Sequence, residues 1–284
     1  MDSLWVILVG SLAAINCSLL GTYLMLRKMA MVSDAMAHSV LPGIVIAFLI
    51  TSSKSSFVVI IGAGFIGVLS TFLIGFLHTK AKLQSDASIG VNFTWMFALG
   101  IILVSLYSKK IDLDPECVLY GEIAYVPLDS WITNAGMNLG PKPMYTLLLV
   151  LLLNLIFIIV SYKKLMITTF DPLYSTSIGI NINIWHYLLM GITSFTIVIV
   201  FDIVGVVLTV ALIIVPPATA YLITKNLKLM LLISVILGTF DSVVGYFLSV
   251  CINSAISGAM VTVAGCVFAC VFGVHCIRRR YGTF

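Results

Sequence analysis

Long apolar runs separated by short polar stretches dominate the pattern of this 284-residue chain. A helix needs about 17 to 25 predominantly apolar residues to cross the hydrocarbon core of a bilayer. Nine runs qualify: 5–26, 32–52, 56–78, 87–107, 144–162, 184–201, 203–224, 228–250 and 255–276. Phe201 and Asp202 alone separate the sixth run from the seventh, so this region could instead hold one span and a broken or re-entrant helix. The pattern therefore predicts an all-α, polytopic transmembrane helical bundle with eight or nine spans.

The composition agrees with a membrane protein. Hydrophobic residues make up 61% of the chain, charged residues only 9%, and the mean hydropathy is +1.18. A soluble domain has about 25% charged residues. The stretch from Met1 to Trp5 lacks the basic segment that begins a signal peptide, so we expect the first run to be retained as a helix. The six cysteines include no C-x-x-C pair, which argues against a disulfide or thiolate-metal framework.

Lysine and arginine are distributed unevenly between the connections, which predicts the orientation of the chain. If all nine runs cross the membrane, eleven basic residues lie on one side and four on the other. The larger set is Arg27, Lys28, Lys80, Lys82, Lys163, Lys164, Lys225, Lys228, Arg278, Arg279 and Arg280, and the smaller set is Lys54, Lys109, Lys110 and Lys142. We expect the larger set to be cytoplasmic, with the N-terminus outside. Eight spans would weaken this bias, so nine spans are preferred.

The longest connection, 108–143, is expected on the outer side and is rich in acidic residues. It holds five of the eleven carboxylates in the chain: Asp112, Asp114, Glu116, Glu122 and Asp129. Such a surface could raise the local concentration of cations at an entrance. The alternative is a solvated loop that caps the helices, with Lys109 and Lys110 diluting the negative charge.

A second connection, 171–179, is expected on the cytoplasmic side. Asp171 is a typical N-cap, Pro172 suits the first helical position and Gly179 suits a C-terminal stop. These signals predict a short helix between two spans. Its apolar members are Leu173, Tyr174 and Ile178. A bare connector needs no capped helix with apolar side chains, so we expect a docking element for a cytoplasmic partner.

A carboxylate and an imidazole lie four residues apart at the start of the second run, at Asp34 and His38. At this spacing both side chains project from one face of a helix. Ionisable residues inside a membrane usually mark a pathway, and Asp with His suits divalent transition metals. The alternative is a helix cap and a hydrogen-bonded histidine. Two ligands in one chain are too few for a tight site, whereas two facing chains would supply four.

Two other carboxylates, Asp202 and Asp241, lie in apolar surroundings. We expect Asp202 at a helix turn on the outer side. Asp241 lies within a span, where it could line the pathway or bond to buried hydroxyls such as those of Thr239 and Ser242.

One nucleotide-binding pattern is present and another is absent. Residues 62–67 formally match G-x-G-x-x-G, but they lie inside a span and not after a strand, so close helix packing is the better interpretation. No G-x-x-x-x-G-K-[ST] occurs, so we expect this chain not to be an ATPase.

Asp34-x-x-x-His38-x-x-x-Pro42-Gly43 resembles the permease subunits of bacterial ABC importers for manganese, zinc or iron. The resemblance extends over almost the whole chain, through segments 21–30, 85–90, 97–100, 119–121, 170–179 and 204–220. The order of these segments makes the match specific. One departure is Pro216-Pro217, where we would expect a single proline followed by alanine.

The resemblance implies a single transmembrane permease domain, 1–284, in the bacterial cytoplasmic (inner) membrane. It implies that Asp34 and His38 contact the transported metal, and that no cofactor is permanently bound. It also implies a separate ATPase that contacts 171–179, a solute-binding protein outside, and a second permease chain, identical or related; no nucleic acid is involved. The residues expected to contact the ATPase are Asp171, Pro172, Leu173, Tyr174, Ile178 and Gly179.

Two other functions are compatible with the same residues. An ion-coupled secondary transporter could use Asp34 and His38 as a proton or cation relay, but it predicts inverted repeats, which the sequence does not display. An intramembrane hydrolase could use Asp202 and Asp241, but neither has a recognisable catalytic context. The ligand types do not distinguish manganese, zinc and iron.

Overall fold

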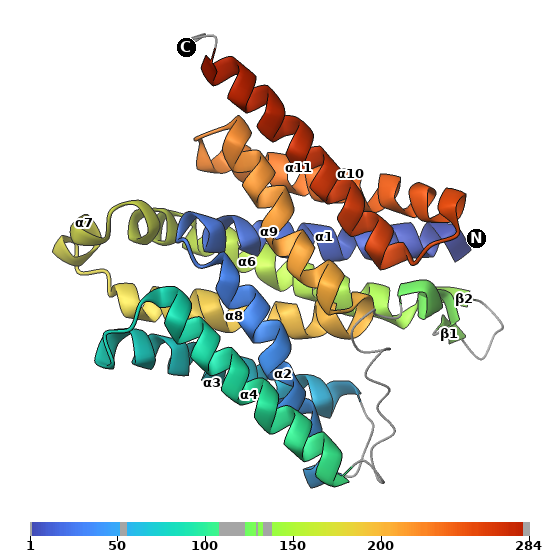
Figure 1. The fold of residues 1–284 in the computed structure, drawn as a ribbon, viewed down its shortest axis with the longest axis horizontal. Coiled ribbons are helices and arrows are strands. Elements are labelled where there is room, and N and C mark those ends of the chain that lie inside the picture. Colours follow the sequence, from blue (N-terminus) through green and yellow to red (C-terminus); the bar gives the residue numbers. More distant parts are fainter. Residues whose placement is uncertain (1, 52–55, 108–122, 129, 133–137, 281–284) are drawn as a thin grey trace. The chain divides into compact units, whose positions relative to one another are not determined.

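The computed structural model describes residues 2–51, 56–107, 123–128, 130–132 and 138–280, almost entirely as helices (Figure 1). Within these ranges, nine helices are long and apolar enough to cross a membrane, which confirms the preferred number of spans. They are α1 (Asp2–Leu26), α2 (Ala30–Thr51), α3 (Ser56–Lys80), α4 (Ser85–Tyr107), α6 (Lys142–Phe170), α8 (Ile182–Val204), α9 (Val206–Ile223), α10 (Leu227–Ile252) and α11 (Ile256–Arg280).

The break between α8 and α9 lies at a different residue from the one the sequence suggested. Phe201 and Asp202 belong to the end of α8, and the chain turns at Gly205, which has φ +86°. A residue with a side chain would be strained at this φ, whereas glycine adopts it readily. The break expected at Phe201 and Asp202 thus lies three residues later, at Gly205, and Asp202 is in the last turn of α8. Asp202 is exposed near the end of α8.

The described part of the connection between α4 and α6 contains small elements. They are the 3₁₀ helix η1 (Ile123–Leu128) and the antiparallel strands β1 (Ser130–Ile132) and β2 (Asn138–Pro141). Several sequence features of this connection lie outside the described residues. They are the acidic positions Asp112, Asp114, Glu116, Glu122 and Asp129, the segment 119–121 and Cys117.

The chain divides into two compact units, and neither is continuous in sequence. The first comprises Met1–Lys28, Glu116–Leu155 and Val200–Phe284, and the second comprises Met29–Pro115 and Ile156–Ile199. Helices α6 and α8 each contribute residues to both. The single permease domain expected over 1–284 stays a prediction.

In the first unit, α1 packs antiparallel against α10 through small and hydroxyl-bearing residues. The Ser242 hydroxyl donates to the Gly10 carbonyl at 3.1 Å, and the Thr22 hydroxyl donates to Ser234 Oγ at 3.2 Å. Small residues let membrane helices approach closely, and hydroxyls then bond across the interface. This packing forms the polar side of a core that also contains the fully buried Tyr23.

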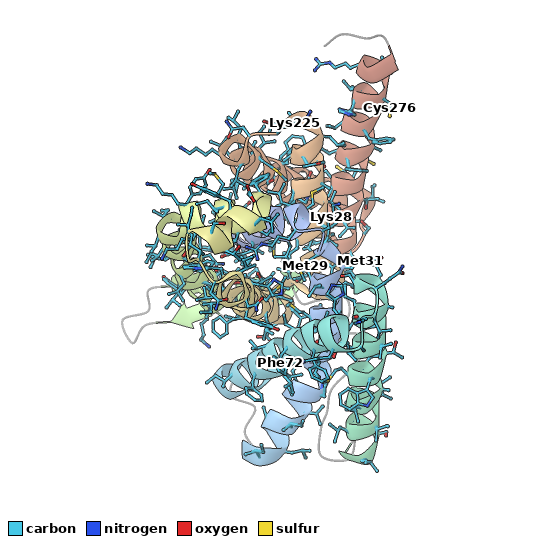
Figure 2. All side chains as sticks on the ribbon, turned by 90° about the vertical axis from the view of Figure 1, so that its left-hand side faces the viewer. Lys28, Met29, Met31, Phe72, Lys225 and Cys276 are labelled. Atoms are coloured by element: carbon cyan, nitrogen blue, oxygen red, sulfur yellow. The ribbon has the colours of Figure 1, made fainter. Side chains whose placement is uncertain are left out.

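In the second unit, glycines bring α3 close to its neighbours. A Cβ at Gly62 would lie 2.5 Å from the Ala47 Cβ on α2, and one at Gly67 would overlap the Ser194 hydroxyl on α8. The G-x-G-x-x-G match therefore serves helix packing, as expected. Apolar side chains such as Phe72 cover the outer surface of α3 and suit contact with lipid (Figure 2).

Candidate functional site

Asp34 and His38 lie one turn apart within α2, in the second compact unit. Helix α2 begins at Ala30, four residues before Asp34, so the Asp34 carboxylate is inside the helix and does not cap it. The Asp34 side chain is 45% exposed and the His38 side chain is 24% exposed. Both are therefore accessible, in a helix whose neighbouring residues Ser33, Ala35 and Ala37 are buried.

The spacing of the two polar atoms suits a shared ion. His38 Nε2 lies 3.6 Å from Asp34 Oδ1, which is too long for a hydrogen bond. Two ligands of one tetrahedral ion, each about 2.1 Å from it, lie about 3.4 Å apart. The pair can therefore accept a divalent cation between its two ligand atoms with little movement.

Aromatic rings from α4 surround the imidazole. The His38 ring centroid lies 5.1 Å from that of Phe93 at an interplanar angle of 68°, and 5.8 Å from that of Phe97 at 85°. Both contacts are edge-on, a preferred arrangement for aromatic pairs. Neither phenylalanine was expected as a site residue from the sequence. The available signal was their four-residue spacing within the expected span 87–107.

The described residues do not complete a metal site around Asp34 and His38. Among the described residues, no group of three or more His, Cys, Asp or Glu side chains could hold a metal ion. An ion held by Asp34 and His38 would have two protein ligands, whereas zinc, for example, takes four. Water, backbone carbonyls or a second chain would have to supply the others.

The short helix expected at 171–179 is present as α7 (Pro172–Ser177). The Tyr174 N–H donates to Asp171 Oδ1 at 2.9 Å, which confirms the predicted N-cap. Gly179 has φ +82°, and the N–H of Ile180 donates to the Ser175 carbonyl at 3.0 Å, as in a glycine-terminated Schellman motif. Helix α7 lies beyond the ends of α6 and α8 (Figure 1).

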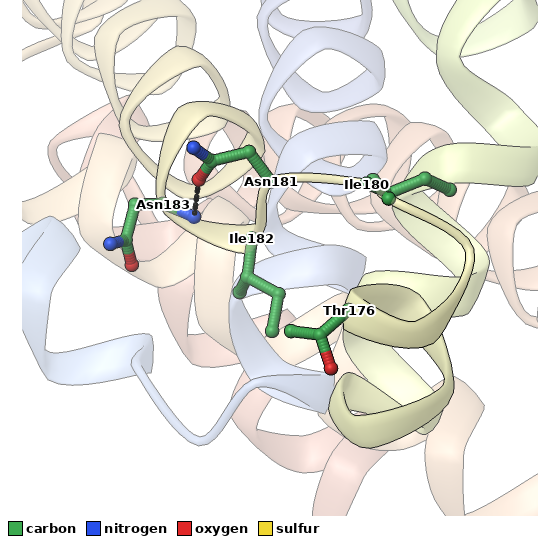
Figure 3. A pocket seen from close by; sticks show the side chains of 6 residues that line it. Thr176, Ile180, Asn181, Ile182 and Asn183 are labelled. Carbon is green, nitrogen blue, oxygen red and sulfur yellow. Dashed lines mark hydrogen bonds between the residues drawn. The ribbon is translucent and has the colours of Figure 1, made fainter.

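Helix α7 presents apolar side chains that no described residue covers. Leu173 is 82% exposed, and Tyr174 and Ile178 are also exposed. A shallow pocket that was not expected from the sequence lies beside this helix. It is lined by Thr176, Gly179, Ile180, Asn181, Ile182 and Asn183 (Figure 3). Asn181 shapes this pocket, because its Oδ1 accepts from the Asn183 N–H at 3.0 Å and caps α8. The sequence signal for this cap was an asparagine, Asn181, just before an apolar run.

Asp241 lies in a different environment, on α10 in the first unit. It is 1% exposed, and its Oδ1 has no hydrogen-bond partner in the described part of the chain. The hydroxyls of Thr239 and Ser242 donate to backbone carbonyls instead. The suggestion that Asp241 satisfies these hydroxyls was therefore wrong, since carbonyls of α10 itself and of Gly10 on α1 accept from them. Asp202 is exposed, so the two carboxylates do not share one environment.

The model of the ABC 3 transport family matches residues 3–275 of the chain. The manganese transport system membrane protein MntD of Bacillus subtilis is 46% identical over 268 residues, covering 94% of this chain and 90% of the relative. The zinc transport system membrane protein TroD of Treponema pallidum is 41% identical over 267 residues, covering 94% of this chain and 72% of the relative.

A solved structure also resembles this chain. PsaBC from Streptococcus pneumoniae, in complex with Fab, superposes with a TM-score of 0.77 at 30% sequence identity. The match covers 94% of this chain and 90% of that chain. The same helical architecture therefore extends over nearly the full length of both.

Proposed function

The chain belongs to the ABC 3 transport family and is a multi-pass protein of the bacterial inner membrane; we propose that it is the permease subunit of an importer for manganese or zinc. The spacing of Asp34 and His38 is the observation that carries this proposal. An imidazole nitrogen and a carboxylate oxygen suit either metal. The two curated relatives described above are named for manganese and zinc, and neither is named for iron.

ATP hydrolysis is assigned to a separate subunit. The sequence contains no G-x-x-x-x-G-K-[ST] with which to hold the phosphates of ATP. Helix α7 is the contact for that subunit, because both of its ends are held by hydrogen bonds and Leu173 is exposed on the side that the charge distribution predicts to be cytoplasmic. A rigid apolar projection transmits movement better than a loop would.

Two further partners complete the transporter. A solute-binding protein delivers the ion to the outer side, where the 108–143 connection is expected. A second permease chain, identical or related, faces Asp34 and His38, so that two carboxylates and two imidazoles line one pathway on a two-fold axis. Four such ligands complete a site that neither chain holds alone. An ion shared between two chains can also leave when the chains move apart.

The decisive experiment is uptake of radiolabelled manganese and zinc by cells that express the chain with its ATPase, together with co-purification of that ATPase. ATP-dependent uptake of either metal supports the proposal. Uptake that persists without an ATPase, and collapses with the proton gradient, would favour a secondary transporter instead.

The coupling role of α7 has its own test. Gly179→Val strains a residue at φ +82°, although no atom lies within 4 Å of the added Cβ. We expect ATP hydrolysis to continue while transport falls. Gly273→Val on α11 is the matched control, because it also adds its Cβ to open space but at an ordinary φ. A cysteine at Leu173 should cross-link to the ATPase, and labelling of that cysteine from outside would contradict both the contact and the orientation.

A further inference from the structure

The support of the His38 ring is unusual for a metal ligand. A ligating histidine usually donates its second ring N–H to a carboxylate, a carbonyl or water. In the described part of the chain, His38 has no polar contact besides Asp34 Oδ1, which lies 3.6 Å from Nε2. The imidazole also contacts two phenylalanine rings. Aromatic packing of the His38 ring thus takes the place of the hydrogen bond that usually orients a ligating histidine.

The two phenylalanines form one surface. Phe93 and Phe97 lie four residues apart on α4, and their rings stack with centroids 5.9 Å apart at 18°. Side chains at this spacing share one helix face. Both rings meet the imidazole edge-on, at 68° and 85°, so they restrict its rotation from two positions along α4. Asp34, one turn earlier on α2, is more exposed than His38.

We propose that Phe93 and Phe97 are positioning residues that hold the His38 imidazole with Nε2 toward Asp34, and that this apolar support keeps the metal readily releasable. The inference rests on the proposed function, because it concerns the same metal ligands. A polar support strengthens the bond between metal and nitrogen, and its loss typically lowers affinity by about 10- to 100-fold. Aromatic packing orients the ring without that strengthening. A transport site gains from this combination, since it must capture an ion and then let it go.

The test measures uptake kinetics in the full chain with its partners, and manganese binding to the purified assembly. Phe93→Leu/Phe97→Leu removes both rings but keeps apolar volume. We expect KM and the dissociation constant for manganese to rise about tenfold. Phe97→Tyr keeps the ring and should restore the wild-type values. Trp95→Leu is the matched control, because Trp95 is an exposed aromatic on the same helix and should change neither constant.

A second variant tests release. Phe93→Gln places an amide near the imidazole, where it can accept a hydrogen bond. Tighter manganese binding together with a lower maximal rate of uptake is the expected result. Unchanged binding in both the double Leu variant and Phe93→Gln would overturn the proposal.

Control measurements distinguish a failure of this inference from a folding defect and from a failure of the proposed function. If the double Leu variant is scarce in the membrane, Phe97→Met replaces it, because methionine keeps the volume without the ring. An unchanged dissociation constant in that variant would equally overturn the proposal. Failure of the wild-type assembly to transport manganese or zinc would contradict the proposed function itself, whereas wild-type transport with unaltered Phe variants contradicts only the positioning role.

Discussion

Two carboxylates within membrane helices, Asp34 and Asp241, lie in opposite surroundings. Asp34 is 45% exposed and has an imidazole 3.6 Å away, whereas Asp241 is 1% exposed and its Oδ1 has no partner among the described residues. Ionisable residues inside a membrane usually have a functional role, so sequence alone would suggest such a role for both. The difference teaches that access and a neighbouring imidazole, in addition to charge, distinguish a candidate transport site from a buried carboxylate. Pathway lining by Asp241 stays a prediction that experiment can test.

The largest effect is expected from the metal pair. Asp34→Ala and His38→Ala should each lower uptake of manganese or zinc by more than about 100-fold, since each removes a direct ligand. Both side chains are partly exposed, so the amount of protein in the membrane should not change. Uptake of labelled metal and immunoblotting measure the two quantities. Asp202→Ala and His275→Ala are the matched controls, and near-normal uptake by both site variants would reduce the pair to a structural role.

A cross-link tests whether a second chain faces the pair. Ala35 and Ser39, next to the ligands, are buried, so a probe there could not reach another chain. Met31, one turn before Asp34, is exposed and is the better position (Figure 2). Met31→Cys should form a disulfide or a short cross-link between two permease chains. Phe72→Cys, on the exposed surface of α3, should not, and the reverse pattern would exclude a shared site at α2.

Asp241→Asn should have a much smaller effect on uptake. The substitution keeps the shape and removes the charge of a side chain with almost no exposure. We expect uptake within about twofold of the wild type, equivalent to about 0.4 kcal/mol. A loss as large as that of Asp34→Ala would establish Asp241 as a pathway residue and erase the contrast between the two carboxylates.

The smallest effect is expected on stability, from Asp241→Leu. The Oδ1 of this buried carboxyl group has no partner among the described residues, so removing it leaves no group there newly unsatisfied. The free energy of unfolding should therefore change by less than about 1 kcal/mol. Thermal unfolding of the purified chain in detergent measures this. A large loss of stability would mean that the second carboxylate oxygen carries a bond essential to the first unit.

Local sequence determined the helices and their ends. Each of the nine apolar runs became one helix, because a span is specified by the hydropathy of its own residues. Asp171 and Gly179 likewise end α7 through hydrogen bonds within a few residues. The pairing of Asp34 with His38 follows from one helical turn. Such features depend on near neighbours in the chain, and they were predictable for that reason.

Tertiary structure decided the surroundings of these elements. Phe93 reaches His38 across 55 positions of sequence, because α4 packs against α2. The burial of Asp241 and the exposure of Asp34 depend on which helices cover α10 and α2, and hydropathy within a span does not encode that choice. Contacts between distant segments leave no pattern in the local sequence. The orientation of the His38 ring by Phe93 and Phe97 is therefore visible only in the tertiary structure.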